Sequence, residues 1–306
     1  MRQFVARRLG YSLLSLLVLS LTIFFFVRVT GDPAALLVEP GASEEDIAAI
    51  HQQFGLDRPL WVQYGLFMAN LARGDFGQSF YYQTPVLELY MDRLPNSLLL
   101  ASVAMAFSLL VGIPTGILAA VRVGRFWDSA GKLFTLLGLS LPSFFVGLVL
   151  ILVFTVYLGW LPSSGSGGPL HLIMPAFALG WYFAAAHMRL TRSSMLEVLG
   201  SEYVKLARLK GLPEALVIGK HAFKNALIPV LTLAGINLVL MINVAVVVET
   251  VFAWPGIGRL LYEGISFRDF PVVQGIVIMG GTMIVVVNLL VDVVYAVIDP
   301  RIRLEK

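Results

Sequence analysis

Long apolar runs separated by shorter polar and charged segments make up most of this chain. A helix needs about 20 consecutive apolar residues to cross the hydrocarbon core of a bilayer. Six runs reach that length, and they cover residues 9–28, 96–121, 133–158, 170–189, 227–250 and 272–298. The pattern therefore predicts an all-α, polytopic membrane protein with six transmembrane helices, and an even number of spans places both termini on one side.

The composition favours the same class. Hydrophobic residues make up 58% and charged residues 13% of the 306, whereas soluble domains carry about 25% charged residues. Arg2, Arg7 and Arg8 precede the first apolar run, as in a secretory signal. However, the run from Leu9 to Val27 is longer than the roughly 7–15 residues of a signal core, and no small-x-small site follows it. We therefore expect a retained helix. The chain contains no cysteine, which excludes disulfides, thiolate metal sites and cysteine nucleophiles.

The distribution of Lys and Arg predicts the orientation, because these residues concentrate in cytoplasmic loops. The segments on one side are strongly basic and hold Arg2, Arg7, Arg8, Arg122, Arg125, Lys132, Arg189, Arg192, Lys205, Arg208, Lys210, Lys220, Lys224, Arg301, Arg303 and Lys306. The segments on the other side hold Arg58, Arg73, Arg93, Arg259 and Arg268 among many acidic residues. Both termini and the loop between spans four and five are therefore predicted to be cytoplasmic. The net charge of +3 follows from this topology, and no nucleic-acid partner is expected.

The external segment between spans one and two, residues 29–95, is too long for a turn and too polar to span. Ser43 followed by three acidic residues predicts a helix start, and Gly55 a helix end. A second short helix is predicted from near Pro59 to Gly74. The segment is expected to form a small external helical cap. It either covers the bundle as a spacer or helps to dock an extracytoplasmic partner, and the sequence leaves both open.

The loop from Arg189 to Pro229 is basic and amphipathic. Residues 194–210 fit a helix in which Met195, Val198, Leu199, Glu202, Leu206 and Leu209 share a side. Gly211 then breaks it, and Pro213 begins a second short helix. Ala207 would permit close approach of helices, Gly211 would supply an elbow with positive φ, and Pro229 would mark the return into the membrane. Such a loop is either a platform for another protein or an interfacial helix held by anionic lipid.

Several motifs in this loop resemble those of a known family. Glu202-Tyr203-Val204, Ala207, Lys210-Gly211-Leu212, His221-Ala222, Asn225-Ala226 and Ile228-Pro229 resemble the EAA loop of binding-protein-dependent ABC importer permeases, in the branch that serves dipeptides, oligopeptides and nickel. The glutamate of the wider signature falls near Lys205-Leu206-Ala207, so only Ala207 and Gly211 match it directly, which puts contacts assigned to that glutamate in doubt.

The resemblance extends over nearly the whole chain. Similar motifs are Arg7-Arg8-Leu9, Gly31-Asp32-Pro33-Ala34, Gly55-Leu56-Asp57-Arg58-Pro59-Leu60, Gly74-Asp75-Phe76-Gly77-Gln78-Ser79, Gly159-Trp160-Leu161-Pro162, Glu249-Thr250-Val251-Phe252, Pro255-Gly256-Ile257-Gly258, Arg268-Asp269-Phe270-Pro271, Asn288-Leu289-Leu290-Val291-Asp292 and Asp299-Pro300-Arg301. Their order and spacing are typical of the subunit called the B-type peptide permease.

The resemblance implies a division of the chain and a set of partners. Residues 1–28 would form the cytoplasmic N-terminus and first span, 29–95 the extracytoplasmic helical loop, and 96–306 the importer core with the coupling loop 190–226. The partners would be a second homologous permease, two ATPase subunits at the cytoplasmic face, an extracytoplasmic binding protein and lipid, in the inner membrane of a bacterium. The implied ATPase-coupling residues are Glu202, Tyr203, Ala207, Lys210, Gly211, Leu212, Asn225 and Pro229.

The chain lacks the motifs of an enzyme. In place of a phosphate-binding loop, Gly131-Lys132 is followed by leucine and Gly219-Lys220 by histidine. We therefore expect ATP and Mg to be bound by the partner ATPases and this chain to bind no cofactor. The four histidines are scattered and predict no metal site: His51, His171, His187 and His221.

Polar residues at membrane depth are costly and often functional. The candidates are Asn237, Asn243, Glu249, Gln274, Asn288 and Asp292. Asn288 and Asp292 share a helix face and either pack against another helix or line a cavity. Glu249 precedes a turn and predicts, with Pro255, Gly256 and Gly258, an outer gate. Pro114, Pro142 and Pro175 interrupt spans two, three and four and are expected to kink them.

The resulting prediction is a permease subunit that forms half of a translocation pathway for dipeptides or oligopeptides. Separate ATPases would drive it and an external binding protein would supply its cargo. Nickel, or another small solute such as glutathione, is the alternative cargo. A secondary transporter is the second class, but it would carry an ion relay or paired broken helices. A membrane-embedded enzyme is the third, and no catalytic constellation supports it.

Overall fold

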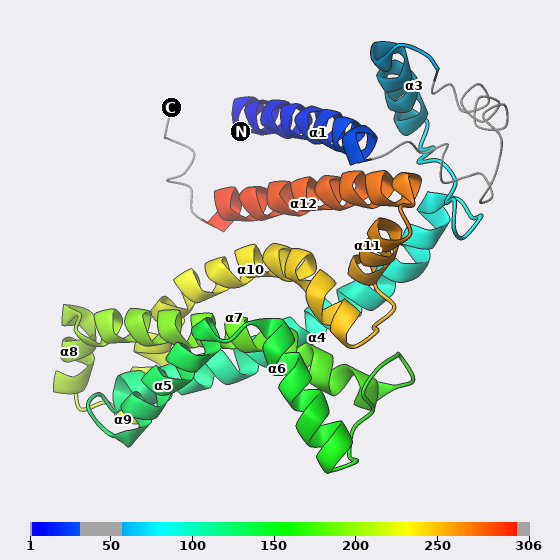
Figure 1. The fold of residues 1–306 in the computed structure, drawn as a ribbon. Helices are drawn as coiled ribbons and strands as arrows, with labels where there is room; N and C mark the ends of the chain where they lie inside the picture. Colours follow the sequence, from blue (N-terminus) through cyan, green and yellow to red (C-terminus); the bar gives the residue numbers. More distant parts are fainter. Residues whose placement is uncertain (1, 31–56, 299–306) are drawn as a thin grey trace. The chain divides into compact units, whose positions relative to one another are not determined.

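The structure, a computed structural model, describes residues 2–30 and 57–298, and that part of the chain is built mainly of helices joined by turns and loops (Figure 1). Residues form two compact units, and each is described here by itself. Unit 1 combines the N-terminal part of the chain through Leu94 with the C-terminal part from Leu260, and unit 2 contains Pro95–Arg259.

Unit 1 is built on two paired helices, α1 (Arg2–Thr30) and α12 (Phe270–Ile298), which lie side by side (Figure 1). Ile23, Val27 and Phe270 form a buried apolar cluster between them. The amphipathic helix α3 (Leu60–Ala72) packs its aromatic side chains on α1, where Phe24 meets Tyr64 at a ring-centroid distance of 5.2 Å. Pro59 precedes α3 and the helix ends before Gly74, which confirms the second predicted short helix, while its external placement stays a prediction. The helix predicted between Ser43 and Gly55 lies outside the described residues.

Helix α4 (Val86–Val121) is long and continuous although Pro95 and Pro114 lie inside it. Its first nine residues belong to unit 1 and the remainder to unit 2. It covers the second predicted span and is long and apolar enough to cross a membrane. Pro114 therefore does not interrupt the second span, contrary to the prediction, and Pro175 likewise lies inside a continuous helix, Pro169–Leu199.

Unit 2 is organised around α7 (Pro169–Leu199), which packs against α5 (Phe126–Ser140), α6 (Ser143–Leu150) and α10 (Lys224–Val251). Its core is apolar and includes Leu100, Met174, Leu179, Phe183, Met241 and Phe252. Small residues let the helices approach, since a Cβ at Gly112 or Gly138 would meet α7.

The third predicted span is bent. Pro142 stands directly before α6, and the helical axis turns by 103° between α5 and the pair formed by α6 and the π-helix η2 (Ile151–Tyr157). The described residues hold five helices that are long and apolar enough to cross a membrane, and this bent pair makes a sixth. With the bent pair counted as one span, the all-α, six-span prediction is confirmed, and the predicted kink at Pro142 is present.

Candidate functional site

The predicted coupling loop is divided by a break that the sequence pattern hides. Helix α7 ends at Leu199, and a second helix, α8, covers Glu202–Leu209. Gly200 closes α7, and Ser201 has extended backbone with ψ of 153°. The prediction of one helix over 194–210 is therefore wrong, because Gly and Ser favour helix ends over helix interiors.

The break changes which side of α8 faces inward. Val204 and Ala207 are buried and pack with Val217, while Leu206 and Leu209 are 52% and 84% exposed. The side shared by Met195, Leu206 and Leu209 in a single helix over 194–210 is therefore not one continuous face, because the helix is interrupted at Gly200 and Ser201. Ala207 occupies the close contact expected of a small residue.

Gly211 forms the elbow after α8. Its φ is +75°, and two backbone hydrogen bonds close the helix end: the Gly211 N–H donates to the Arg208 carbonyl at 2.9 Å, and the Leu212 N–H donates to the Ala207 carbonyl at 3.4 Å. This is a Schellman motif with glycine at the left-handed position. Among the described residues, nothing lies within 4 Å of the place where a Cβ would stand. Backbone conformation, not crowding, therefore favours glycine here.

The chain after the elbow becomes one long helical path. Pro213 precedes α9 (Glu214–Leu216), which continues through the π-helix η3 (Val217–Phe223) into α10 without a gap. The start of the helix agrees with the prediction at Pro213, but the second helix is not short. Pro229 lies inside α10, sixteen residues after Pro213, which precedes the helical path. Its place at the return into the membrane stays a prediction.

Polar contacts fasten α8 to this path. The Asn225 side-chain amide donates to the Tyr203 hydroxyl at 2.9 Å and to the His221 carbonyl at 3.1 Å. Arg208 donates two hydrogen bonds to Glu214, from Nη2 at 2.7 Å and from Nε at 3.2 Å, and these bonds raise the pKa of Arg208 above its ordinary value. All three pairs are exposed, so they orient the loop and contribute little free energy.

The outward face of α8 is apolar with a basic rim. Tyr203, Leu206 and Leu209 are between 44% and 84% exposed, and Lys205 and Lys210 flank them. Lys205 also pairs with Glu202 at 2.8 Å. Seven of the eight predicted coupling residues lie in this loop or at the start of α10. The eighth, Pro229, lies further along α10.

A second predicted site surrounds Glu249, which is fully buried. Its carboxylate accepts hydrogen bonds from the Ser97 hydroxyl at 2.6 Å, the Gly258 N–H at 2.7 Å and the Arg259 N–H at 3.1 Å. The Ser97 hydroxyl oxygen also accepts from the Ile257 N–H at 2.8 Å. Because these N–H groups begin helix α11 (Ile257–Ser266), Glu249 caps that helix with negative charge.

The turn between α10 and α11 is closely packed. The Trp254 indole donates to the Asn96 carbonyl at 3.0 Å, and the Asn96 amide donates to the Pro255 carbonyl at 2.9 Å. A Cβ at Gly258 would meet the backbone of Val246, so only glycine fits. The structure brings Glu249, Pro255, Gly256 and Gly258 together, while their action as an outer gate stays a prediction.

Sequence reasoning missed two polar clusters in unit 2. The buried Asp128 carboxylate accepts hydrogen bonds from Arg192 Nε at 2.7 Å and from the Gly124 N–H at 3.0 Å. It also forms an ion pair with Lys132 at 2.9 Å. The spacing of Asp128 and Lys132 is the signal that could have found it. The other cluster joins three helices.

That cluster centres on His187, which is buried on α7. Its Nδ1 lies 3.3 Å from the Ser108 hydroxyl of α4 and its Nε2 lies 3.2 Å from the Asn237 amide of α10. His187 therefore links three helices of unit 2 through its two ring nitrogens. Among the other predicted polar residues, Asn243 donates to its own helix at the Val239 carbonyl, Asn288 is exposed, and the side chain of Asp292 lies outside the described part.

Comparison with known proteins identifies the family. Residues 112–304 match the family described as binding-protein-dependent transport system inner membrane component, and residues 1–101 match its N-terminal membrane component family. The chain is 40% identical over 304 residues to the glutathione transport system permease protein GsiC of Salmonella choleraesuis strain SC-B67, and 39% identical to GsiC of Escherichia coli strain K12, covering 99% of both chains in each case.

Solved structures show a similar fold. The inward-facing MetNI methionine ABC transporter matches with a TM-score of 0.57 and 19% identity, covering 70% of this chain and 97% of that chain. An amino acid ABC transporter described with histidines matches with a TM-score of 0.55 and 16% identity, covering 68% and 92%. The chain therefore belongs to the binding-protein-dependent transport system inner membrane components, as a multi-pass permease subunit of an ABC importer whose ATP hydrolysis is carried out by partner subunits.

Proposed function

We propose that this permease imports short peptides of the glutathione class and receives its drive at the outward face of α8. Glutathione is a tripeptide, so the relatives named as glutathione permeases support a cargo within the peptide class. Longer peptides and nickel are the competing cargoes. The chain would form half of the pathway, with a second homologous permease forming the other half and two ATPases below them.

The exposed apolar face of α8 is the observation that carries the coupling proposal. Leu209 is 84% exposed at the end of α8, and Tyr203 and Leu206 lie beside it. Burial of these side chains under a partner would lower the free energy of the complex. The inward side of the same helix is fixed by Val204 and Ala207. A partner that pushes on Leu206 and Leu209 therefore moves a supported element, and the basic rim favours an acidic edge on the partner.

The turn held by Glu249 has a proposed role at the other end of α10. Its buried carboxylate joins the end of α10 to the first residues of α11, so both elements are expected to move as one piece. In this proposal Glu249, Pro255, Gly256 and Gly258 form the fixed part of a gate, and movement comes from α10 itself.

Uptake in cells tests the cargo. Cells with and without this chain, with its partners intact, are given labelled glutathione, a dipeptide, a longer peptide and nickel. Loss of glutathione uptake alone supports the proposal, while loss of only nickel or only longer peptides moves the cargo to that class. Unchanged uptake of all four contradicts the proposed cargo.

Two matched variants test the coupling surface separately from the cargo. Leu209→Asp places a charge on the outward face of α8, and Val123→Asp places the same charge on an exposed apolar residue between α4 and α5, outside the loop 190–226. We expect Leu209→Asp to abolish uptake and release the ATPases from the purified complex, and Val123→Asp to retain both. Equal behaviour of the two variants would contradict the proposal.

A further inference from the structure

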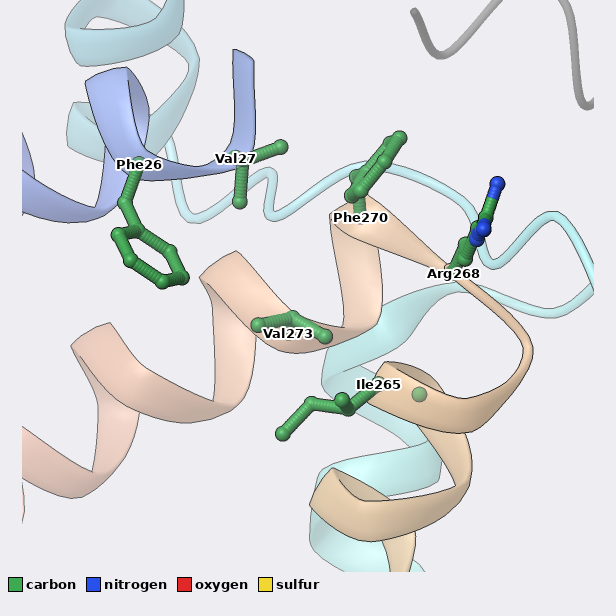
Figure 2. A pocket seen from close by; sticks show the side chains of 7 residues that line it. Phe26, Val27, Ile265, Arg268, Phe270 and Val273 are labelled. Atoms are coloured by element: carbon green, nitrogen blue, oxygen red, sulfur yellow. The ribbon is translucent and has the colours of Figure 1, made fainter. Parts of the chain in front are cut away.

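Unit 1 contains a pocket of about 190 Å³ at the point where α11 turns into α12 (Figure 2). Its walls come from the end of α1, the end of α11 and the start of α12. The labelled lining residues are Phe26, Val27, Ile265, Arg268, Phe270 and Val273. Five of these six side chains are apolar, so the pocket favours a hydrocarbon ligand.

The pocket lies at the ends of two spans. The apolar span of α1 covers Gly10–Val29, and that of α12 begins at Phe270. Phe26 and Ile265 are 65% and 59% exposed, so the pocket is open where these side chains stand. An apolar cavity of roughly 150 Å³ is large enough to hold a small hydrocarbon such as benzene. This pocket can therefore hold a segment of an acyl chain at the depth of the membrane interface.

Arg268 stands at the pocket in an unusual backbone conformation. Its φ is +54°, and the Arg268 N–H donates to the Ile265 carbonyl at 3.2 Å while the Asp269 N–H donates to the Gly264 carbonyl at 2.7 Å. These bonds make a Schellman motif at the end of α11, in which glycine usually occupies the left-handed position. An arginine there must hold a disfavoured conformation, which points to a use for its side chain.

Within residues 2–30 and 57–298, the Arg268 guanidinium has no ion-pair partner. It is exposed, and it makes no side-chain hydrogen bond or ion pair with the side chains that the structure describes. The neighbouring Asp269 is buried, and its carboxylate accepts from the Ser79 hydroxyl at 2.5 Å and from the Tyr81 N–H at 3.0 Å. Arg28, at the end of the other span, donates to Gln63 at 3.0 Å and stacks on Phe24. Unlike Arg28, Arg268 is therefore free of partners among the described side chains and can donate hydrogen bonds to an external anion.

We propose that this pocket is a phospholipid site, with one acyl chain between Phe26, Ile265 and Val273 and the phosphate on Arg268. A guanidinium binds phosphate through two parallel hydrogen bonds. A phospholipid carries an anionic phosphate next to its acyl chains. The pocket likewise places Arg268 next to apolar walls, so one lipid molecule can contact both. A soluble anion would leave the walls uncovered, and an apolar helix of a partner would leave the charge without a counterion.

Photo-crosslinking in the assembled importer tests this site. The full-length complex is reconstituted with phosphatidylglycerol and phosphatidylethanolamine that carry a diazirine on one acyl chain, and labelled residues are mapped by mass spectrometry. We expect adducts on Phe26, Ile265 and Val273. Arg268→Gly removes the side chain while keeping the left-handed backbone, and it should reduce these adducts about fivefold. Arg268→Lys should reduce them less, because it keeps the charge.

The control is Arg73→Gln at the end of α3, an exposed arginine outside the pocket, which should leave the adducts unchanged. Equal labelling of wild type and Arg268→Gly, with both complexes assembled, would overturn the proposal. Adducts that vanish when the soluble binding protein is added would instead make this face a protein contact. Displacement of the label by excess inorganic phosphate would make it an anion site without lipid selectivity.

Discussion

Helices α8 and α11 end with the same backbone motif but with opposite choices of residue. Both close with the paired hydrogen bonds of a Schellman motif, and both place one residue at positive φ, Gly211 at +75° and Arg268 at +54°. A side chain in this conformation costs about 1–2 kcal/mol. Gly211 avoids that cost where only a change of direction is needed. Arg268 accepts it, which indicates that its side chain has a task beyond ending the helix.

The starts of the same two helices also differ, because a side chain caps α11 and, among the described residues, none caps α8. The Ser201 hydroxyl before α8 donates to the Val198 carbonyl at 2.6 Å and makes no cap to α8, whereas buried Glu249 caps α11. Glu249→Gln should break this contrast with the largest effect, because it removes the negative charge at the start of α11 and turns the oxygen that accepts from the Ser97 hydroxyl into an amide donor. We expect a destabilisation of about 3 kcal/mol and loss of uptake.

The thermal midpoint of the purified importer, measured beside labelled uptake, checks this change. Exposed Glu197→Gln is the control and should alter neither. Unchanged midpoint and uptake in Glu249→Gln would remove Glu249 from both the cap and the gate.

Gly211→Val addresses the elbow itself. A β-branched residue at positive φ costs about 2 kcal/mol, so the end of α8 should rearrange and uptake should fall about tenfold at unchanged membrane levels. Gly211→Asn tolerates the left-handed conformation and should retain most uptake. Similar losses in both variants would mean that size, not backbone conformation, matters at this position.

Arg268→Gly should stabilise the protein, whereas Gly211→Val should destabilise it. Removing the side chain from a left-handed position relieves local strain, so the thermal stability of the purified importer should rise by about 1 kcal/mol or stay constant. A clear loss of stability in lipid-free detergent would show that the arginine has an internal structural role, against the contrast drawn with Gly211.

The exposed pair between Arg208 and Glu214 should matter least. Breaking it with Arg208→Gln is expected to cost about 0.5 kcal/mol or less, because solvent screens exposed ion pairs. A double-mutant cycle with Glu214→Gln, read from the thermal midpoint, measures the coupling. A coupling energy well above this value would mean that the pair, and not Gly211, sets the direction of the chain after α8.

The apolar spans, the helix start after Pro59, the bend at Pro142 and the turn at Gly211 could be predicted from the sequence, because each depends on nearby residues. The break at Gly200 could not, because the apolar spacing before and after it stays in phase with one helix. The continuity of the path through Pro229 was also hidden, since proline usually marks an end. Long apolar helices tolerate it when their neighbours satisfy the freed carbonyl.

The site was predictable only in part for a related reason. The coupling residues lie close together along the chain, so one loop contains them. Ser97, which donates to Glu249, and Ser108, which lies beside His187, come from a part of the sequence far from these residues, and a single sequence carries no signal for such pairs. The charge of Arg268 could be read from the sequence, but its apolar pocket could not, because the pocket forms only where α1 packs beside α12.

The unbroken helical path from Glu214 to Val251 has a mechanical consequence. It contains 38 residues, and at 1.5 Å per residue it is about 55 Å long, nearly twice the roughly 30 Å of hydrocarbon that it crosses. The same rod therefore begins beside the coupling elbow and ends at the buried carboxylate that holds α11. A tilt of the helix imposed at Pro213 would be transmitted to Glu249 without passing through a loop. The π-helical turn and Pro229 are the points where the helix could bend and so reduce the movement that reaches Glu249.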